Sequence, residues 1–272
     1  MVDGQQNKIG LIIQARMKSG RLPGKVLMPL PFPDGDQLLS IIVKQLNKIE
    51  AKVIIATSKN NENDAIASFC KQKKIECFRG SEDDVLSRFI EIQKTHNFDQ
   101  IVRLTADNPI VDTSILSDFI QYHITNKADY SFTKGLPLGM NFEIINGAAL
   151  LRSEQYVNSK ADREHVTLAI KRETLFLKKC YAIESGLDKL RLTVDTPKDF
   201  LTLSAILSCQ KSYNLTGLKL IQILYDNEPW LFEGNAGVFQ KNSSIKFDDE
   251  LSGAINLLQS LDYNRVVKKL KS

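Results

Sequence analysis

The chain has 272 residues, of which 43% are hydrophobic, enough for one large domain or for one domain with a small appendage. Its formal net charge of +4 comes from 36 basic and 32 acidic residues spread along the chain, and so mild and dispersed an excess excludes a long basic groove for nucleic acid. No apolar run reaches the ~18 residues of a membrane span, and the N-terminus lacks a signal-peptide pattern, so we expect a cytoplasmic protein. The cysteines form no CxxC pair, so we expect no zinc site.

Short apolar runs alternate with stretches of helical length in the first half of the chain. Four of these runs have the length and composition of buried strands: residues 9–13, 53–56, 75–78 and 101–104. In the first stretch between them, apolar side chains recur at steps of four and three, which predicts an amphipathic helix: Leu38, Ile42, Leu46 and Ile49. The sequence Ser-Glu-Asp-Asp at residues 81–84 resembles a capping box and predicts another helix from Val85. Strands that alternate with helices form a parallel sheet covered on both faces, so we predict a doubly wound, mostly parallel α/β fold.

The pattern changes in the middle of the chain. Two strand-like runs, 129–132 and 141–145, flank the turn sequence KGLPLG. A helical stretch and a further strand near residues 176–183 follow. We therefore predict a small antiparallel excursion from the α/β core at about residues 129–181.

The chain then returns to the core. The apolar run 190–194 ends shortly before Thr196, which can cap a helix that has proline at its first position and an acidic residue at its third. We expect these segments to form one α/β domain of residues 1–227. Residues 228–272 are polar and rich in turn residues, with one short basic helix predicted near residues 263–270, and form a C-terminal extension of unknown role.

A basic loop follows the first apolar run, with the sequence QARMKSGRLPGK at residues 14–25. Open α/β sheets bind ligands at the carboxyl ends of their strands, where glycines let backbone N–H groups approach phosphate and cations neutralise it. The loop is not a P-loop, because only three residues separate Gly20 from Gly24 and because Val26 follows Lys25 in place of Ser or Thr. We predict a polyphosphate site, and the alternative is a solvated surface loop.

Two aspartates stand in the same local pattern. Asp107 and Asp195 each follow an apolar run, and each precedes a proline by two residues. If the two runs end at the same edge of the sheet, the carboxylates can hold Mg²⁺, which binds through one or two carboxylates together with substrate phosphates. The alternative is that each aspartate caps the helix or turn that follows it.

These motifs together resemble the SpsF-like branch, named for spore coat polysaccharide biosynthesis, of the cytidylyltransferase family, which also includes CMP-sialic acid and CMP-KDO synthetases. The resemblance covers about residues 8–210 in order, and it rests on the segments IIQAR, RLPGK, ATS, FRGSEDDVL, RLTADNP, REHVT and LTVDTP. One departure is Gly20, where the branch usually has a threonine. The resemblance implies a nucleotide-diphospho-sugar transferase-like fold and transfer of CMP from CTP to a sugar or sugar acid, with release of pyrophosphate, for polysaccharide or glycan biosynthesis.

The resemblance also implies roles for individual residues. The predicted catalytic residues are Arg16, Lys25, Asp107 and Asp195, of which the two aspartates bind the metal. The predicted nucleotide contacts are Gln14, Ala15, Arg16, Arg21, Lys25, Thr57, Ser58, Arg79, Gly80, Thr105 and Asp107. The predicted acceptor contacts are Asn108, Glu143, Arg163, Glu164 and His165. The excursion resembles the region through which related synthetases dimerise, so a homodimer is expected.

Two other functions stay open at this point. A glycosyltransferase is the first, because the same fold hosts both reactions, although the dense basic loop suits an entering triphosphate better than a nucleotide-sugar donor. A non-catalytic nucleotide-binding protein is the second, although Arg16, Lys25 and both aspartates are present. The Arg163-Glu164 pair has its own alternative, an ordinary ion pair on a helix face.

Overall fold

A computed structural model describes residues 7–238 and 247–271. Seven strands form one sheet in the order β5-β4-β1-β6-β8-β7-β9. Their bounds are β1 (Ile9–Gln14), β4 (Lys52–Ser58), β5 (Glu76–Gly80), β6 (Gln100–Thr105), β7 (Tyr130–Lys134), β8 (Glu143–Asn146) and β9 (Lys178–Ala182). Strands β5, β4, β1 and β6 pair in parallel, and the predicted doubly wound, mostly parallel sheet is confirmed.

The predicted excursion extends this same sheet. Strand β8 is antiparallel to both of its neighbours, β6 and β7, whereas β9 pairs in parallel with β7. A separate two-stranded antiparallel sheet consists of β2 (Pro29–Leu30) and β3 (Asp36–Gln37). The antiparallel character predicted for residues 129–181 is therefore confined to the pairings of β8.

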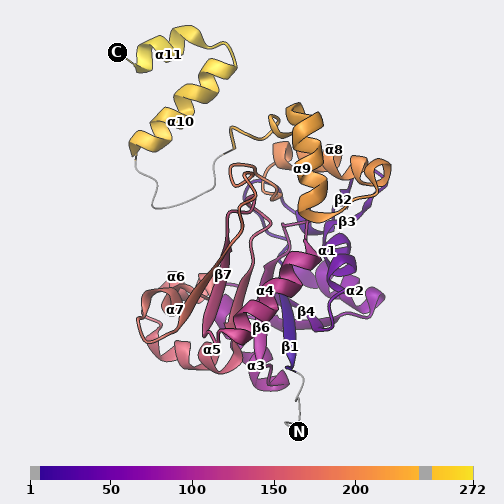
Figure 1. Ribbon diagram of the computed structural model, residues 1–272, viewed down its shortest axis with the longest axis vertical. Helices are drawn as coiled ribbons and strands as arrows, with labels where there is room; N and C mark the ends of the chain where they lie inside the picture. Colours follow the sequence, from indigo (N-terminus) through magenta and orange to yellow (C-terminus); the bar gives the residue numbers. More distant parts are fainter. Residues whose placement is uncertain (1–6, 239–246, 272) are drawn as a thin grey trace.

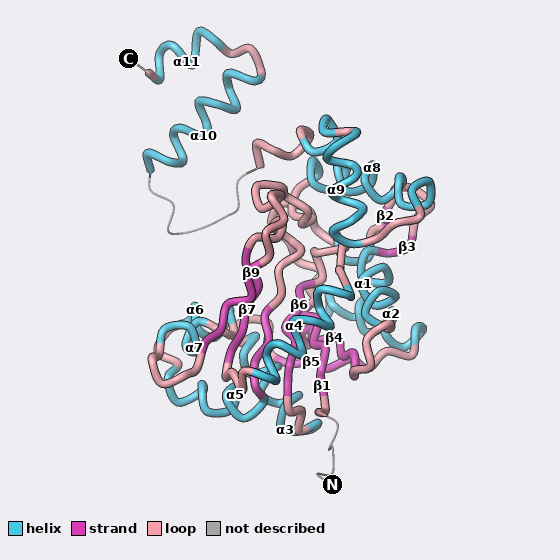
Figure 2. The backbone as a smooth tube through the Cα atoms, in the orientation of Figure 1, coloured by secondary structure: helices cyan, strands magenta, loops and turns pink. Residues whose placement is uncertain are grey.

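The sheet has a hydrophobic core on each face, because successive side chains of a strand point to opposite sides. In β1, Leu11 and Ile13 belong to one core and Ile12 to the other. The first core is covered by α1 (Leu38–Leu46), α2 (Asp64–Lys73), α4 (Thr113–Thr125), α8 (Pro197–Tyr213) and α9 (Gly217–Asn227). The second is covered by α3 (Val85–His96), α5 (Gly147–Ser153) and α7 (Leu168–Arg172), and α6 (Lys160–His165) contacts α3. Figure 2 shows helices on both sides of the strands. Short 3₁₀ helices complete the fold: η1 (Lys25–Leu27), η2 (Asn61–Asn63), η3 (Glu154–Tyr156) and η4 (Pro229–Phe232).

Helix starts and ends follow the local sequence with two corrections. Helix α8 begins as predicted, with a capping box between Thr196 and Asp199 and with proline at its first position. Helix α3 begins at Val85 as predicted, and Ser81 Oγ accepts a hydrogen bond from the Asp84 N–H at 3.1 Å, but the cap of the helix is Asp84, whose carboxylate accepts a hydrogen bond from the Ser87 N–H at 2.8 Å. Helix α1 ends at Leu46, and Ile49 lies beyond it in a turn.

The run 190–194 is an extended segment and not a strand of the sheet. It makes a single isolated parallel bridge, between Leu138 and Arg191. The Val194 N–H donates to the Asp107 carbonyl at 2.8 Å, which joins this segment to the loop after β6. The segments that carry the two aspartates therefore meet as predicted, but the prediction that both are strand ends of the sheet is wrong.

Two helices form the C-terminal end of the chain. The predicted basic helix corresponds to α11 (Asn264–Leu270), whereas α10 (Phe247–Ser260) was not predicted. Figure 1 shows both lying apart from the sheet. Within residues 7–238 and 247–271, no helix combines the length and the apolarity that crossing a membrane requires.

Candidate active site

The basic loop after β1 is held in place by backbone hydrogen bonds. The Met17 N–H donates to Asn63 Oδ1 at 2.8 Å, and the Gly24 N–H donates to the Met17 carbonyl at 2.9 Å. Gly24 has φ 74°, in the left-handed region that favours glycine, and it directly precedes η1. This turn points Lys25, the first residue of η1, back toward the sheet.

Lys25 joins the two predicted metal ligands. Its Nζ donates to Asp107 Oδ2 at 3.0 Å, to Asp195 Oδ1 at 2.9 Å and to the Val194 carbonyl at 2.6 Å. The Lys25 side chain is only 9% exposed, whereas those of Asp107 and Asp195 are 28% and 20% exposed. One buried ammonium group therefore bridges two carboxylates that are both partly exposed to solvent.

Asp195 is paired more extensively than Asp107. Its Oδ2 lies 3.1 Å from Arg21 Nη2 and 2.8 Å from Arg191 Nη2. Burial alone would raise the pKa of Asp195, but hydrogen bonds and charges from Lys25, Arg191 and Arg21 outweigh burial and hold the pKa below its ordinary value. Asp195 is therefore ionised at neutral pH.

A pocket of about 350 Å³ lies beside this cluster. It is lined by ten of the predicted site residues: Gln14, Ala15, Arg16, Arg21, Lys25, Thr105, Asp107, Glu164, His165 and Asp195. Gly20 lines it as well, and a Cβ at this glycine would meet no atom within 4 Å. We call this cavity the phosphate pocket, after the basic loop that lines it.

Seven predicted residues do not line the phosphate pocket, and five of them line no neighbouring cavity of the site. Thr57 and Ser58 are fully buried at the end of β4, and Arg79 donates to the Ser58 and Asn60 carbonyls at 3.0 and 3.1 Å. Gly80, at the end of β5, lies beneath the side chain of an arginine on α3. Arg163 forms an ion pair with Asp84 at 3.1 Å. Their predicted contacts with nucleotide and acceptor stay predictions.

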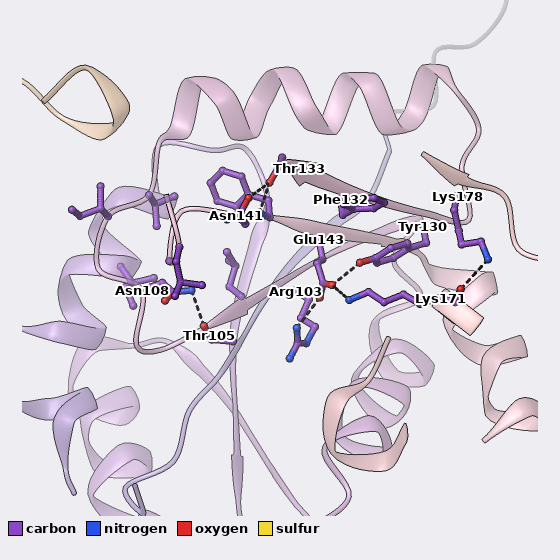
Figure 3. Close-up of a pocket in the computed structure, with 17 residues that line it drawn as sticks. Arg103, Thr105, Asn108, Tyr130, Phe132, Thr133, Asn141, Glu143, Lys171 and Lys178 are labelled. Carbon is purple, nitrogen blue, oxygen red and sulfur yellow. Dashed lines mark hydrogen bonds and ion pairs between the residues drawn. The ribbon is translucent and has the colours of Figure 1, made fainter. Parts of the chain in front are cut away.

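A second pocket, of about 580 Å³, contains the remaining two predicted residues, Asn108 and Glu143 (Figure 3). Thr105 lines both pockets, and it accepts a hydrogen bond from Asn108 Nδ2 at 2.9 Å. The two pockets therefore adjoin at the end of β6. We call the second cavity the β8 pocket.

Glu143 is the centre of a polar network in the β8 pocket (Figure 3). It accepts hydrogen bonds from Arg103 Nη1 at 2.7 Å, Lys171 Nζ at 2.6 Å and the Tyr130 hydroxyl at 2.5 Å. Burial would raise the pKa of Glu143, but the two cations outweigh burial and lower the pKa to about 2. Burial and the adjacent carboxylate raise the pKa of Tyr130, so its hydroxyl stays protonated and donates.

The sequence interpretation missed several arginines of these sites. Arg88 lines the phosphate pocket, Arg103 contacts Glu143, and Arg191 bonds both Asp195 and Asp199. A signal was present for Arg88, because it is a charged residue three positions after Val85 and four before Ile92, on a helix face that is otherwise apolar. For Arg191, the four-residue steps to Asp195 and Asp199 were the available signal.

The donor set at Lys25 fits a hard divalent cation. Two carboxylate oxygens converge on one positive group, and oxygen ligands are those that Mg²⁺ prefers. Among residues 7–238 and 247–271, no group of three or more His, Cys, Asp or Glu side chains is arranged to hold a metal. Asp107 and Asp195 would therefore hold such an ion together with ligand phosphates and not as an all-protein site.

Comparison with known proteins identifies the family. Residues 11–233 match the family described as cytidylyltransferase. The chain belongs to the cytidylyltransferase family. The chain is 36% identical over 212 residues to spore coat polysaccharide biosynthesis protein SpsF of Bacillus subtilis, a match that covers 74% of this chain and 86% of SpsF.

Solved structures agree with the fold. A cytidylyltransferase from Leptospira borgpetersenii superposes with a TM-score of 0.77 at 29% identity, over 89% of this chain and 100% of that chain. A CMP:2-keto-3-deoxy-manno-octonic acid synthetase complexed with CTP superposes with a TM-score of 0.56 at 14% identity, over 75% of this chain and 99% of that chain. The second likeness supports the nucleotide-sugar transferase-like fold alone.

Proposed function

We propose that this cytidylyltransferase transfers the cytidylyl group of CTP to a hydroxyl group of a sugar acid and releases pyrophosphate. The observation that supports this function most directly is the convergence of Asp107 and Asp195 on Lys25 at the end of a basic, glycine-containing loop. A triphosphate needs cations around it, and the carboxylate pair gives the divalent ion that accompanies it a place to bind.

The phosphate pocket would bind the triphosphate of CTP. Arg16, Arg21 and Lys25 all line it, and they would neutralise phosphate oxygens. Asp107 and Asp195 would hold Mg²⁺, which when bound supplies positive charge that offsets the negative charge of the triphosphate and so lets the acceptor hydroxyl approach. Because Lys25 contacts both carboxylates in the structure, it would keep them neutralised until ligand arrives.

The reaction would be an in-line displacement at the α-phosphorus of CTP. A bond forms between the acceptor hydroxyl oxygen and that phosphorus, the bond from the phosphorus to the β-phosphate oxygen breaks, and pyrophosphate leaves with the bonding electron pair. The hydroxyl proton goes to solvent. Positioning and electrostatic stabilisation provide most of the rate in such a reaction, so the fixed cations of the loop matter more than any acid or base.

The β8 pocket would bind the acceptor. It adjoins the phosphate pocket at Thr105, so a hydroxyl group held there could face the α-phosphate. Three cations line it, Arg103, Lys171 and Lys178, against the single carboxylate of Glu143. This positive excess favours an anionic acceptor, such as the carboxylate of a sugar acid.

The remaining expectations about the chain are also proposals. We infer a homodimer formed through residues 129–181, an α/β catalytic domain at residues 1–227 and a separate C-terminal extension at residues 228–272. We place the enzyme in the cytoplasm, where CTP is available, with a role in polysaccharide or glycan biosynthesis.

Pyrophosphate release by the purified protein tests the proposal. Each of the four nucleoside triphosphates is supplied with Mg²⁺ and a panel of sugar acids, beside an Asp107→Asn variant and a Lys44→Met control at an exposed ion pair. Release that requires CTP, an acceptor and Asp107, and that Lys44→Met leaves unchanged, is the expected result. Release with no dependence on acceptor, or equal release by Asp107→Asn, would contradict it.

A further inference from the structure

Asp195 is linked to the C-terminal extension through buried polar side chains. Arg191 Nη2 donates to Asp195 Oδ2 at 2.8 Å, and the Nε and Nη2 of the same guanidinium group donate to the two carboxylate oxygens of Asp199 at 2.7 and 3.1 Å. Asn235 Nδ2 donates to Asp199 Oδ1 at 2.9 Å and to the Arg191 carbonyl at 3.0 Å. We call Arg191, Asp199 and Asn235 the Arg191 network.

The Arg191 network is closed to solvent. Arg191 is 7% exposed, Asn235 is 1% exposed and Asp199 is fully buried. Arg191 Nη1 has no hydrogen-bond partner among the residues that the structure describes, so the bonds of Nε and Nη2 orient the guanidinium group. Buried hydrogen-bonded networks behave as a unit, so a change at one member affects the others.

The network holds Asp195 by its backbone and by its side chain. Asp199 Oδ2 accepts a hydrogen bond from the Asp195 N–H at 3.0 Å, and Arg191 binds the Oδ2 of the Asp195 carboxylate. The other oxygen of that carboxylate, Oδ1, faces Lys25 Nζ at 2.9 Å. The network therefore sets which oxygen Asp195 presents at the position proposed for the divalent ion.

Asn235 comes from the C-terminal extension, beyond the residues 11–233 that match the family. It follows η4, whose last two residues are each 6% exposed and belong to the first core. Between η4 and Asn235, the chain passes close to α8 at Gly234, where a Cβ would lie 2.8 Å from Thr202 Oγ1. The packing of η4 and the close approach at Gly234 together bring Asn235 to the network.

We propose that Asn235 is a positioning residue for Mg²⁺ binding at Asp195, an inference that rests on the proposed function. Without its amide, Asp199 Oδ1 loses one of the two side-chain donors that the structure shows, and the Arg191 carbonyl loses its bond to the extension. Arg191 is then held less firmly, and so is the Asp195 carboxylate that it orients. Groups that orient a metal ligand typically change metal affinity by about 10- to 100-fold. Asn235 acts one contact further away, so we expect about three- to tenfold.

Calorimetric binding of CTP in the presence of Mg²⁺ and in EDTA tests the inference. The ratio of the two affinities is the factor by which the metal tightens CTP binding, and we call it the Mg²⁺ gain. Asn235→Leu keeps the shape of the side chain and removes its hydrogen bonds, so it should reduce the Mg²⁺ gain about three- to tenfold. In EDTA it should bind CTP with wild-type affinity, because the cations of the basic loop are unchanged.

A matched control separates positioning from a loss of stability. Ile120→Val, on α4 and outside the network, removes one buried methyl group and so destabilises the protein. It should keep the wild-type Mg²⁺ gain, because the gain compares two affinities of the same folded protein. If Asn235→Leu fails to fold, Asn235→Ser keeps one donor in a smaller side chain and should give a gain between those of wild type and of a protein without the amide.

The outcomes for the inference and for the proposed function differ. Asn235 variants that keep the wild-type Mg²⁺ gain would overturn the inference and leave the proposed function intact. A gain that falls equally in Ile120→Val, or an affinity in EDTA that falls as far as that in Mg²⁺, would also overturn it, because the role of Asn235 would then be structural. Wild-type protein that does not bind CTP, or whose CTP binding Mg²⁺ does not tighten, would contradict the proposed function itself.

Discussion

Replacement of Lys25 by methionine tests the charge balance at the centre of the site. The substitution keeps the length of the side chain and removes the ammonium group that contacts Asp107, Asp195 and the Val194 carbonyl within 3.0 Å. Two carboxylates then face each other without the buried cation between them. We expect Lys25→Met to destabilise the free protein and to make it depend on a divalent cation.

The size of the effect follows from burial. Removing one partner of a fully buried ion pair costs about 3–5 kcal/mol. Here both carboxylates are between a fifth and a third exposed, and Asp195 keeps Arg21 and Arg191, so water and these arginines reduce the loss. We expect about 2–3 kcal/mol, which for a domain of this size lowers Tm by about 4–12 °C.

Thermal unfolding with and without Mg²⁺ measures this effect. Millimolar Mg²⁺ should raise the Tm of Lys25→Met by more than that of the wild-type protein, because the variant offers the ion two carboxylates without a competing ammonium group. Lys44→Met, at the exposed pair with Asp36, should change stability by less than about 0.5 kcal/mol. A Lys25→Met protein as stable as wild type, or an equal Mg²⁺ effect on the Tm of both proteins, would contradict this role of Lys25.

Three further predictions concern other parts of the molecule. Lys171→Met removes one of the cations beside Glu143 and should raise the KM for a sugar acid about tenfold while the KM for CTP stays unchanged, which steady-state kinetics would reveal. Burial lowers the pKa of His123 from 6.5 to about 4, so below pH 6.5 the unfolded chain takes up a proton that the folded chain does not. Denaturant unfolding should therefore show that the unfolding free energy falls by about 2 kcal/mol between pH 7 and pH 5. His123→Gln should show a smaller loss if this histidine is the cause. Thr196→Ala removes one half of the capping box with Asp199 and should lower the unfolding free energy by about 1 kcal/mol, and an unchanged Tm would contradict the role of the cap.

Much of the fold could be predicted from local sequence because the strands of the α/β core are continuous apolar runs. The four parallel strands β1, β4, β5 and β6 lie where those runs predict them, and the cap at Thr196 follows from its immediate neighbours. The direction in which strands pair is not a local property. Strand β9 has the same alternation whether it pairs in parallel or antiparallel, and only the structure shows that it is parallel to β7.

The C-terminal extension shows a signal that was present but not used. Leu251, Ile255 and Leu258 recur at steps of four and three within α10, the same spacing that predicted α1. The polar residues around them made the segment look like a loop. Apolar spacing is therefore the better guide here, even where the overall composition is polar.

The candidate site was predictable in its residue types and not in its contacts. The two aspartates and the basic loop were identified from their positions after apolar runs. The contacts of Lys25 with Asp107 and Asp195 join residues 82 and 170 positions apart, and no local pattern encodes a contact of that separation. Arg88 was missed because an arginine on an apolar helix face looks like an interruption of the pattern, whereas the structure makes it part of a pocket wall.

The fate of the α-phosphate of CTP decides whether the protein transfers a cytidylyl group to an acceptor. The protein is incubated with Mg²⁺, a panel of sugar acids and CTP labelled with ³²P at the α-position, and the products are separated. We expect the label to enter a CMP-sugar only when an acceptor is present, and to enter it much more slowly with Asp107→Asn. Label that stays in CTP with every acceptor, or that appears as CMP or CDP whether or not an acceptor is added, would contradict it.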